Sequence, residues 1–205
     1  MLSWLLPPRS MSLLHILEPD DSSPERAILA RVSAGSRHAF DEVVSTHLEP
    51  LLGYAYSLVG SQEVAEDIAQ DVFCWLWHNR LSIRVQGSLR AYLFAAARHR
   101  AIDHFRRVRT EVHAAAEFTR ELVVPAMGTK QCATDDRAIH NDLTSSLRRA
   151  VDELPTRRRE IVLLRWRQFT NAEIAVVMGI SIKTVEAQVT RAFETLREHL
   201  THWVR

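Results

Sequence analysis

Apolar residues recur every three or four positions along most of the chain, the spacing that places them on one side of an α-helix. Gly60 interrupts one such stretch and Ser61 follows it directly, which predicts the end of one helix and the cap of the next. No stretch alternates between apolar and polar residues in the way that predicts a strand. The first half is expected to form four helices, at about 24–35, 38–59, 61–77 and 88–108.

The apolar period stops after residue 108 and resumes near residue 137. The intervening segment contains Pro125 and Gly128, and we expect a flexible linker there. Further helices are predicted at 137–152, 156–168, 171–178 and 182–199. The expected fold is therefore all-α, with two small helical domains joined by a linker. The predicted boundaries are a flexible N-terminal arm at 1–22, a first domain at 23–108, the linker at 109–136 and a second domain at 137–205.

The composition is that of an ordinary globular protein, because 46% of the 205 residues are hydrophobic and 25% are charged. Two cysteines, Cys74 and Cys132, are too few for a disulfide framework and favour a reducing compartment, so we expect a cytoplasmic protein. The longest apolar run, 91–97, is far shorter than the ~20 residues of a membrane-spanning helix. The N-terminal residues do not form a convincing signal peptide, and a start at either Met1 or Met11 fits the sequence.

The net charge of +1 conceals a strong segregation of charge along the chain. Residues 20–79 carry 3 basic and 10 acidic side chains, whereas residues 80–110 carry 8 basic side chains against Asp103 alone. A second basic block, at 137–205, has 12 basic and 8 acidic residues. Two separated basic blocks favour a polyanionic partner, and the acidic block favours a different, protein partner. Solvated helix faces are the alternative explanation of the charge pattern alone.

The sharpest local motif begins at Thr170. Thr170 and Glu173 have the spacing of a capping box. Gly179 supplies the left-handed residue that ends the helix, and Ser181 caps the next one. Ala175 is small at the point where the two helices must approach each other. The pattern predicts a helix-turn-helix, whose second helix enters the major groove of DNA, although a plain helical hairpin could use the same caps.

Contacts to base edges are expected from the first turns of this second helix. Glu186 can accept a hydrogen bond from cytosine, Gln188 can pair with adenine, and Arg191 is better placed for a phosphate. A solvated helix face is the alternative for each residue taken singly. The candidates for this contact are Ser181, Lys183, Thr184, Glu186, Ala187, Gln188, Thr190 and Arg191.

The chain resembles bacterial sigma-70-family factors in two separate blocks. The block from 154 to 200 is similar to the fourth conserved region of that family in Leu154-Pro155, Glu173-Ile174-Ala175, Gly179-Ile180-Ser181, Thr184-Val185 and Arg191-Ala192. The block from about 25 to 108 is similar to the second region in Phe40-Asp41-Glu42, Ala65-Glu66-Asp67, Gln70-Asp71-Val72-Phe73 and the run from Ser88 to Arg107. Nothing between them resembles the third region, which is the layout of the extracytoplasmic-function group.

The resemblance implies a transcription initiation factor that joins core RNA polymerase, recognises two promoter elements and promotes DNA opening. It assigns core polymerase binding, by position, to Asp67, Gln70, Asp71 and Phe73. It assigns the minus-ten promoter element to Tyr92, Arg98, His99, Arg100, His104, Arg106 and Arg107, and the minus-thirty-five element to the helix-turn-helix. The implied partners are core RNA polymerase, promoter DNA and an anti-sigma factor. No cofactor and no small-molecule substrate are implied, because the polymerase performs the catalysis.

Three positions depart from the pattern of the family. Tyr92 stands where the family usually has tryptophan, which keeps an aromatic platform. His99 stands where an asparagine usually reads the flipped base, so the base preference there is open. Glu186 stands where lysine or arginine is frequent, and the minus-thirty-five sequence of better-known relatives therefore does not carry over.

Two other interpretations fit parts of the sequence. The segment 171–190 alone also fits a stand-alone helix-turn-helix regulator with a helical sensor domain. In such a sensor, however, Asp67, Gln70 and the basic helix that follows them would have no role.

Cys74 and His78 are four residues apart on one predicted helix, as metal ligands can be. Because no third ligand is near, we expect a small buried thiol beside an interfacial histidine and no metal. No motif of a catalytic site is present, which makes an enzyme the least favoured interpretation.

Overall fold

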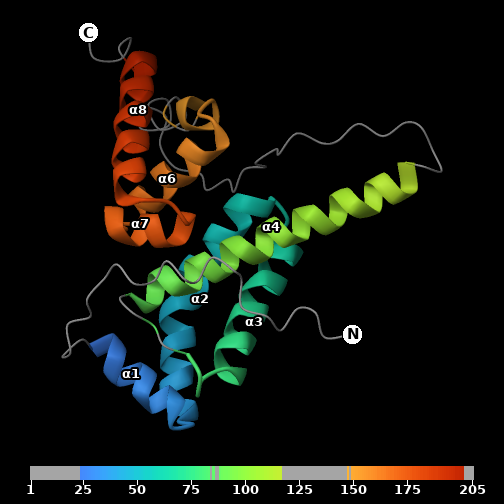
Figure 1. Ribbon diagram of the computed structural model, residues 1–205, viewed down its shortest axis with the longest axis vertical. Coiled ribbons are helices and arrows are strands. Elements are labelled where there is room, and N and C mark those ends of the chain that lie inside the picture. Colours follow the sequence, from blue (N-terminus) through green and yellow to red (C-terminus); the bar gives the residue numbers. More distant parts are fainter. Residues whose placement is uncertain (1–23, 84, 86–87, 117–146, 148, 201–205) are drawn as a thin grey trace, which may run out of the picture. The chain divides into compact units, whose positions relative to one another are not determined.

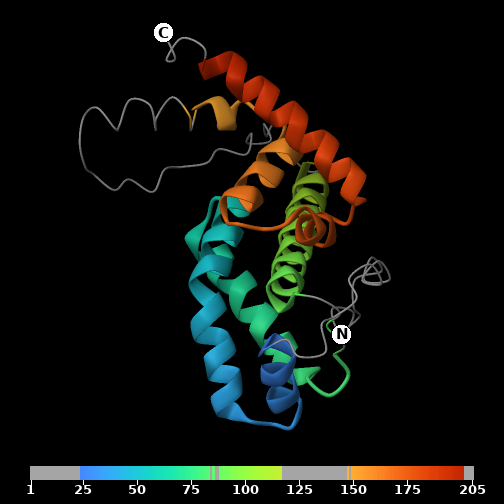
Figure 2. The same ribbon diagram turned by 90° about the vertical axis from the view of Figure 1, so that its left-hand side faces the viewer.

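The structure is a computed structural model, and it describes residues 24–83, 85, 88–116, 147 and 149–200 (Figures 1 and 2). Every regular element within these ranges is a helix, as the sequence predicted. The chain divides into two compact units, 1–130 and 131–205, and each is described by itself. None of the described helices combines the length and the apolar character that a bilayer-spanning helix requires.

The first unit contains α1 (Pro24–Ser33), α2 (Arg37–Val59), α3 (Gln62–His78) and α4 (Leu89–Ala116). Helix α2 packs against each of the other three, and α3 also packs against α4 (Figure 1). The core lies where α2, α3 and α4 meet, and the Tyr54 and Phe94 rings stack there with their centroids 4.9 Å apart. Burial of such large aromatic side chains supplies much of the stability of a small helical domain.

The boundary predicted at Gly60 and Ser61 is confirmed, and Ser36 adds a cap at the start of α2 that was not predicted. The Ser36 hydroxyl accepts a hydrogen bond from the backbone of Ala39, and the Ser61 hydroxyl accepts one from the backbone of Val64. Gly60 has a φ of 71°, in the left-handed region where glycine is not strained, and it ends α2. The Glu25 carboxylate accepts a hydrogen bond of 2.8 Å from the backbone of Leu89 and so ties α1 to the beginning of α4.

Helix α4 is longer than the apolar pattern indicated, because it extends to Ala116 and not to about residue 108. Residues 109–116 lack a regular apolar period but contain neither glycine nor proline, and they include three alanines, the strongest helix formers. The linker expected at 109–136 therefore begins with helix. Its remaining residues, the N-terminal arm and Cys132 lie outside the described part of the chain.

The second unit contains α6 (Thr156–Trp166), α7 (Asn171–Met178) and α8 (Ile182–Leu200). Of the helix expected at 137–152, residues 147 and 149–152 are described, and they are helical. Helix α6 ends two residues before the expected position, and Gln168 beyond it has a left-handed φ of 63°. The buried cluster that joins the segment before α6 to α6 and α8 consists of Ala150, Val151, Leu154, Val162, Ala192 and Leu196.

Arg159 fixes the connection that precedes α6. Its Nε donates to the carbonyl of Val151 at 3.2 Å, and Nη2 donates to the carbonyls of Asp152 and Leu154. These carbonyls belong to the end of a helical segment, where backbone acceptors lack partners within the helix. An arginine at this place therefore satisfies backbone groups instead of presenting its charge to solvent.

Candidate functional site

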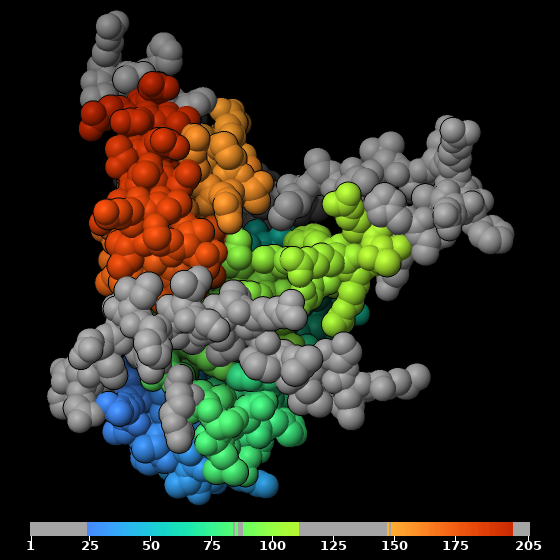
Figure 3. Space-filling model, viewed as in Figure 1, coloured from blue at the N-terminus to red at the C-terminus, as the bar shows by residue number. Residues whose placement is uncertain are grey.

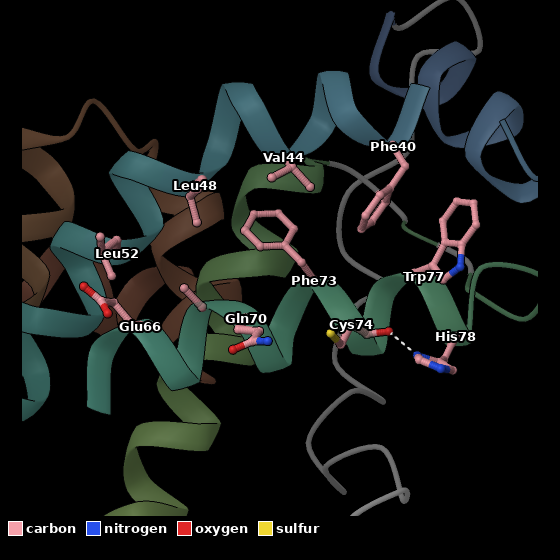
Figure 4. Close-up of a pocket in the computed structure, with 11 residues that line it drawn as sticks. Phe40, Val44, Leu48, Leu52, Glu66, Gln70, Phe73, Cys74, Trp77 and His78 are labelled. Atoms are coloured by element: carbon pink, nitrogen blue, oxygen red, sulfur yellow. Dashed lines mark hydrogen bonds between the residues drawn. The ribbon is translucent and has the colours of Figure 1, made fainter. Parts of the chain in front are cut away.

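Helix α3 presents a polar outer face and a buried inner face. Asp67, Gln70 and Asp71 are all exposed, as expected for residues that contact a partner. Phe73 is only 6% exposed, because its ring packs toward α2 (Figure 4). The structure therefore exposes three of the four residues assigned to polymerase binding, and it gives Phe73 a place in the core from which it supports that face.

An apolar groove of about 530 Å³ lies beside this face, between α2 and α3 (Figure 4). Its α2 side is formed by a row of apolar residues spaced four apart, and its α3 side by aromatic, polar and small residues. Leu48 is 41% exposed, so part of the groove is open to solvent. The α2 residues are Phe40, Val44, Leu48 and Leu52, and the α3 residues include Gln70, Phe73, Cys74, Trp77 and His78.

The sequence prediction did not identify this groove. The four-residue spacing from Phe40 to Leu52 was the available signal, because it places a second apolar stripe beside the core stripe of Val43, Leu51 and Tyr54. An apolar stripe that remains partly exposed in this way is typical of a surface that contacts a partner. Trp77 closes one end of the groove, packed against Phe40 at 4.9 Å with the Arg80 guanidinium 4.5 Å from its ring centre.

The expectation of a buried Cys74 thiol is wrong. Cys74 is exposed and lines the groove between α2 and α3. The ring nitrogen Nδ1 of His78 lies 2.7 Å from the backbone oxygen of Cys74, so the histidine is held by the helix backbone. Within the described residues, no group of three or more His, Cys, Asp or Glu side chains could hold a metal ion.

The basic side chains of α4 form two sets. Arg98, His99, Arg100 and His104 are partly buried, whereas Arg106 and Arg107 are exposed farther along the helix. Residues 105–110 of α4 are all exposed at the molecular surface (Figure 3). Nδ1 of His99 lies 3.0 Å from the carbonyl oxygen of Ala95, which orients the imidazole along the helix. Arg106 pairs with Asp103 at 3.2 Å.

Tyr92 differs from the aromatic platform that the sequence suggested. Its side chain is 3% exposed and its ring centre lies 6.0 Å from that of Trp75, so neither ring face is open to a base. Burial raises the pKa of its hydroxyl far above the ordinary value. The hydroxyl has no hydrogen-bond partner among the described residues. Tyr92 lies in the first turn of α4, on the apolar face that packs into the core of the unit. It therefore supports the basic helix from the core side.

The helix-turn-helix is formed by α7 and α8, as predicted. The Thr170 hydroxyl accepts from the backbone of Glu173, and the Glu173 carboxylate accepts from the backbone of Thr170, so both halves of the capping box are present. Gly179 has a left-handed φ of 64°. The Ser181 hydroxyl accepts from the backbone of Thr184 at 3.1 Å and caps α8.

Seven of the eight residues expected to face DNA are exposed on α8 or its cap. Gln188 is the exception, because it is partly buried and its Oε1 accepts a hydrogen bond of 3.2 Å from Nε of Arg158 on α6. The exposed seven are Ser181, Lys183, Thr184, Glu186, Ala187, Thr190 and Arg191.

Each of the two units matches a region of a known protein family. The model of sigma-70 region 2 matches residues 43–111, and the model of sigma-70 region 4 matches residues 144–196. The chain is 24% identical to the ECF RNA polymerase sigma factor SigW of Bacillus subtilis, over 84% of this chain and 94% of SigW. It is 25% identical to the RNA polymerase sigma factor CnrH of Cupriavidus metallidurans, over 86% of this chain and 93% of CnrH.

Solved structures show the same fold. The sigma factor RpoE of Bartonella quintana, solved with the anti-sigma factor NepR, has a TM-score of 0.60 at 23% identity and covers 78% of this chain and 96% of its own. CnrH, solved with the cytosolic domain of CnrY, has a TM-score of 0.58 at 23% identity and covers 85% of this chain and 96% of its own. The two region matches together span more than half of the sequence, one in each unit. The chain therefore belongs to the sigma-70 family, as an RNA polymerase sigma factor of the extracytoplasmic-function group.

Proposed function

We propose that this sigma factor joins core RNA polymerase through its first unit, recognises the minus-ten element with α4 and the minus-thirty-five element with α8, and promotes DNA opening. The observation that carries the proposal is the arrangement of α3 and α4. An exposed acidic face and a basic helix lie on neighbouring elements of one unit, which gives a protein partner and a polyanion separate surfaces.

Core polymerase would dock on the exposed side of α3. Asp67, Gln70 and Asp71 supply two carboxylates and an amide there, and the adjoining groove supplies apolar surface at Leu48 and Trp77. Stable protein interfaces combine an apolar centre with a polar rim, and this surface offers both. Phe73 contributes by holding α3 in place.

Promoter DNA would be bound by the two basic regions. Arg106 and Arg107 are exposed and suit phosphate contacts, while His99 and Arg98 lie nearer the core of the unit, where a base that has left the stack could be read. Arg100 and His104 complete the proposed minus-ten surface. In the second unit, α8 would place Lys183, Glu186 and Ala187 toward base edges of the minus-thirty-five element, with Ser181, Thr184, Thr190 and Arg191 around them.

An anti-sigma factor is a further proposed partner, because the similar RpoE structure contains one, NepR.

The proposed function requires neither a small-molecule substrate nor a cofactor. We also propose that the protein is not an enzyme itself and acts in the cytoplasm, where core polymerase is.

The stand-alone regulator is not favoured, because the match to sigma-70 region 2 covers the unit that would have to be its sensor. The two functions are separated by incubating the purified protein with core RNA polymerase and isolating the complex by affinity purification. A sigma factor is retained at equal stoichiometry with the core enzyme, whereas a stand-alone regulator is not retained and binds its operator equally well without polymerase.

A further inference from the structure

Arg158 joins α6 to the recognition helix α8. Its Nε donates a hydrogen bond of 3.2 Å to Oε1 of Gln188, thirty residues later in the sequence. Both side chains are partly buried. Neither the helix-turn-helix motif nor its capping residues include Arg158, which lies in the first turns of the preceding helix.

The position of Gln188 on α8 explains this contact. The buried stripe of α8 contains Val185, Ala192 and Leu196, all less than 5% exposed. Gln188 lies three residues after Val185 and four before Ala192, so it borders the stripe that packs on the rest of the unit. An amide at this border needs partners for its polar atoms, and Arg158 provides one for Oε1. The side chain is thereby directed toward α6 and away from the outer face of α8.

The guanidinium of Arg158 retains unused donors. Arginine has five N–H groups, and the bond to Gln188 uses only the one on Nε. Among the residues that the structure describes, no carboxylate or other acceptor engages its terminal nitrogens. Thr184 and Arg191, which are four residues before and three after Gln188, are exposed on the same flank of α8. This flank therefore carries donors from two helices.

The flanks of a recognition helix lie beside the DNA backbone. A helix about 10–12 Å across nearly fills a major groove about 12 Å wide, so residues on its outer face meet base edges and residues on its flanks meet the phosphates. We propose that Arg158 contacts a backbone phosphate at the minus-thirty-five element, and that Gln188 is a positioning residue that holds its guanidinium instead of reading adenine. This inference rests on the proposed function, since it requires α8 to occupy the major groove of promoter DNA.

The two residues can be tested separately with holoenzyme assembled from core polymerase and the full-length factor. The probe is a promoter fragment that the unaltered holoenzyme has selected from a random-sequence library. Binding is measured as a function of salt, and base preference is measured on the same fragment with its distal element randomised. Arg197→Ala is the matched control, because it removes one exposed positive charge from the far end of α8.

Arg158→Ala is expected to lower the slope of log affinity against log salt by about one and to weaken binding similarly for all sequences. Gln188→Leu should weaken binding severalfold without changing base preference at any position, and it should have no further effect when Arg158 is already alanine. Arg158→Lys should keep the slope but lose the dependence on Gln188, since a lysine has no planar fork.

Two results would overturn the inference: a salt slope for Arg158→Ala equal to that of Arg197→Ala, or a changed base preference at one position for Gln188→Leu. Failure of the unaltered protein to form a holoenzyme or to select any promoter would contradict the proposed function itself, before either variant is measured. Helicity of the free variants by circular dichroism distinguishes loss of contact from loss of fold.

Discussion

Arg100 on α4 holds Asp71 on α3. Its Nη1 lies 3.3 Å from Oδ2 of Asp71, and its Nη2 lies 3.3 Å from the backbone oxygen of the same residue. The Arg100 side chain is 23% exposed and that of Asp71 is 63% exposed. The pair therefore connects a residue proposed to bind polymerase with a residue proposed to bind DNA. A substitution of Asp71 should consequently alter DNA binding through Arg100.

Asp71→Asn should strengthen binding of the free factor to DNA more than Asp67→Asn does. Both substitutions remove one negative charge from the exposed face of α3, but only Asp71 pairs with a basic side chain of α4. An exposed ion pair contributes about 0–1 kcal/mol, so the difference should not exceed about fivefold. Fluorescence anisotropy with a labelled duplex at low salt measures it. Equal gains for the two variants would show that Arg100 is not restrained by the pair.

Asp67→Ala and Gln70→Ala should each weaken the association with core polymerase and leave the fold intact. Both side chains are exposed and lie outside the apolar face of α3. Glu63→Ala is the control, because Glu63 is an exposed acidic residue in the first turn of the same helix and does not line the groove. A competition assay against a labelled reference sigma factor gives the affinities. If Glu63→Ala lowers the affinity for core polymerase as much as the other two substitutions do, the association depends on the overall negative charge of α3 and not on a specific contact with this face.

Glu186→Arg should move base preference toward guanine at one position of the minus-thirty-five element, by about 1–3 kcal/mol. A carboxylate can only accept hydrogen bonds, which suits the cytosine amino group, whereas arginine can donate to both acceptors of guanine. If the preference at the minus-thirty-five element is unaltered, Glu186 does not read a base.

His99→Ala on the same promoter should leave binding to the minus-thirty-five element nearly unchanged but lower the yield of open complex, as seen by permanganate reactivity. If the DNA melts normally without the histidine, His99 is not part of the proposed minus-ten site.

The stability of the first unit should fall when the pH decreases through about 6.5. Burial, and secondarily the charge of Arg90, hold the pKa of His47 below its ordinary value of 6.5. Between the lowered pKa and 6.5 the unfolded chain binds more protons than the folded one, so acidification favours unfolding, whereas above 6.5 this contribution is constant. Urea unfolding of the wild-type protein and of His47→Gln from pH 5 to 8 isolates the effect. If the pH dependence of stability is the same in His47→Gln as in the wild-type protein, groups other than His47 cause it.

Local chemistry predicted the capped helix boundaries well, because each cap depends on a few neighbouring residues. Gly60, Ser61, Thr170 and Gly179 act through backbone groups within four residues, and the structure confirms all four. Cys74 and Tyr92 could not be placed in this way. Their exposure depends on how neighbouring helices pack: Cys74 of α3 is exposed, whereas Tyr92 of α4 is buried with its ring beside Trp75 of α3. The bond between Arg158 and Gln188 likewise joins residues whose proximity only the packing of α6 on α8 creates.

The proposed function can be tested by transcription in vitro from a promoter fragment selected by the holoenzyme, with core polymerase that lacks any other sigma factor. A specific run-off transcript and permanganate-reactive thymines at the minus-ten element are expected only when this protein is added, and neither signal is expected with the Asp67→Ala, Gln70→Ala double variant. Specific DNA binding by the protein alone, without a transcript or an opened element in the presence of core polymerase, would contradict the proposed function.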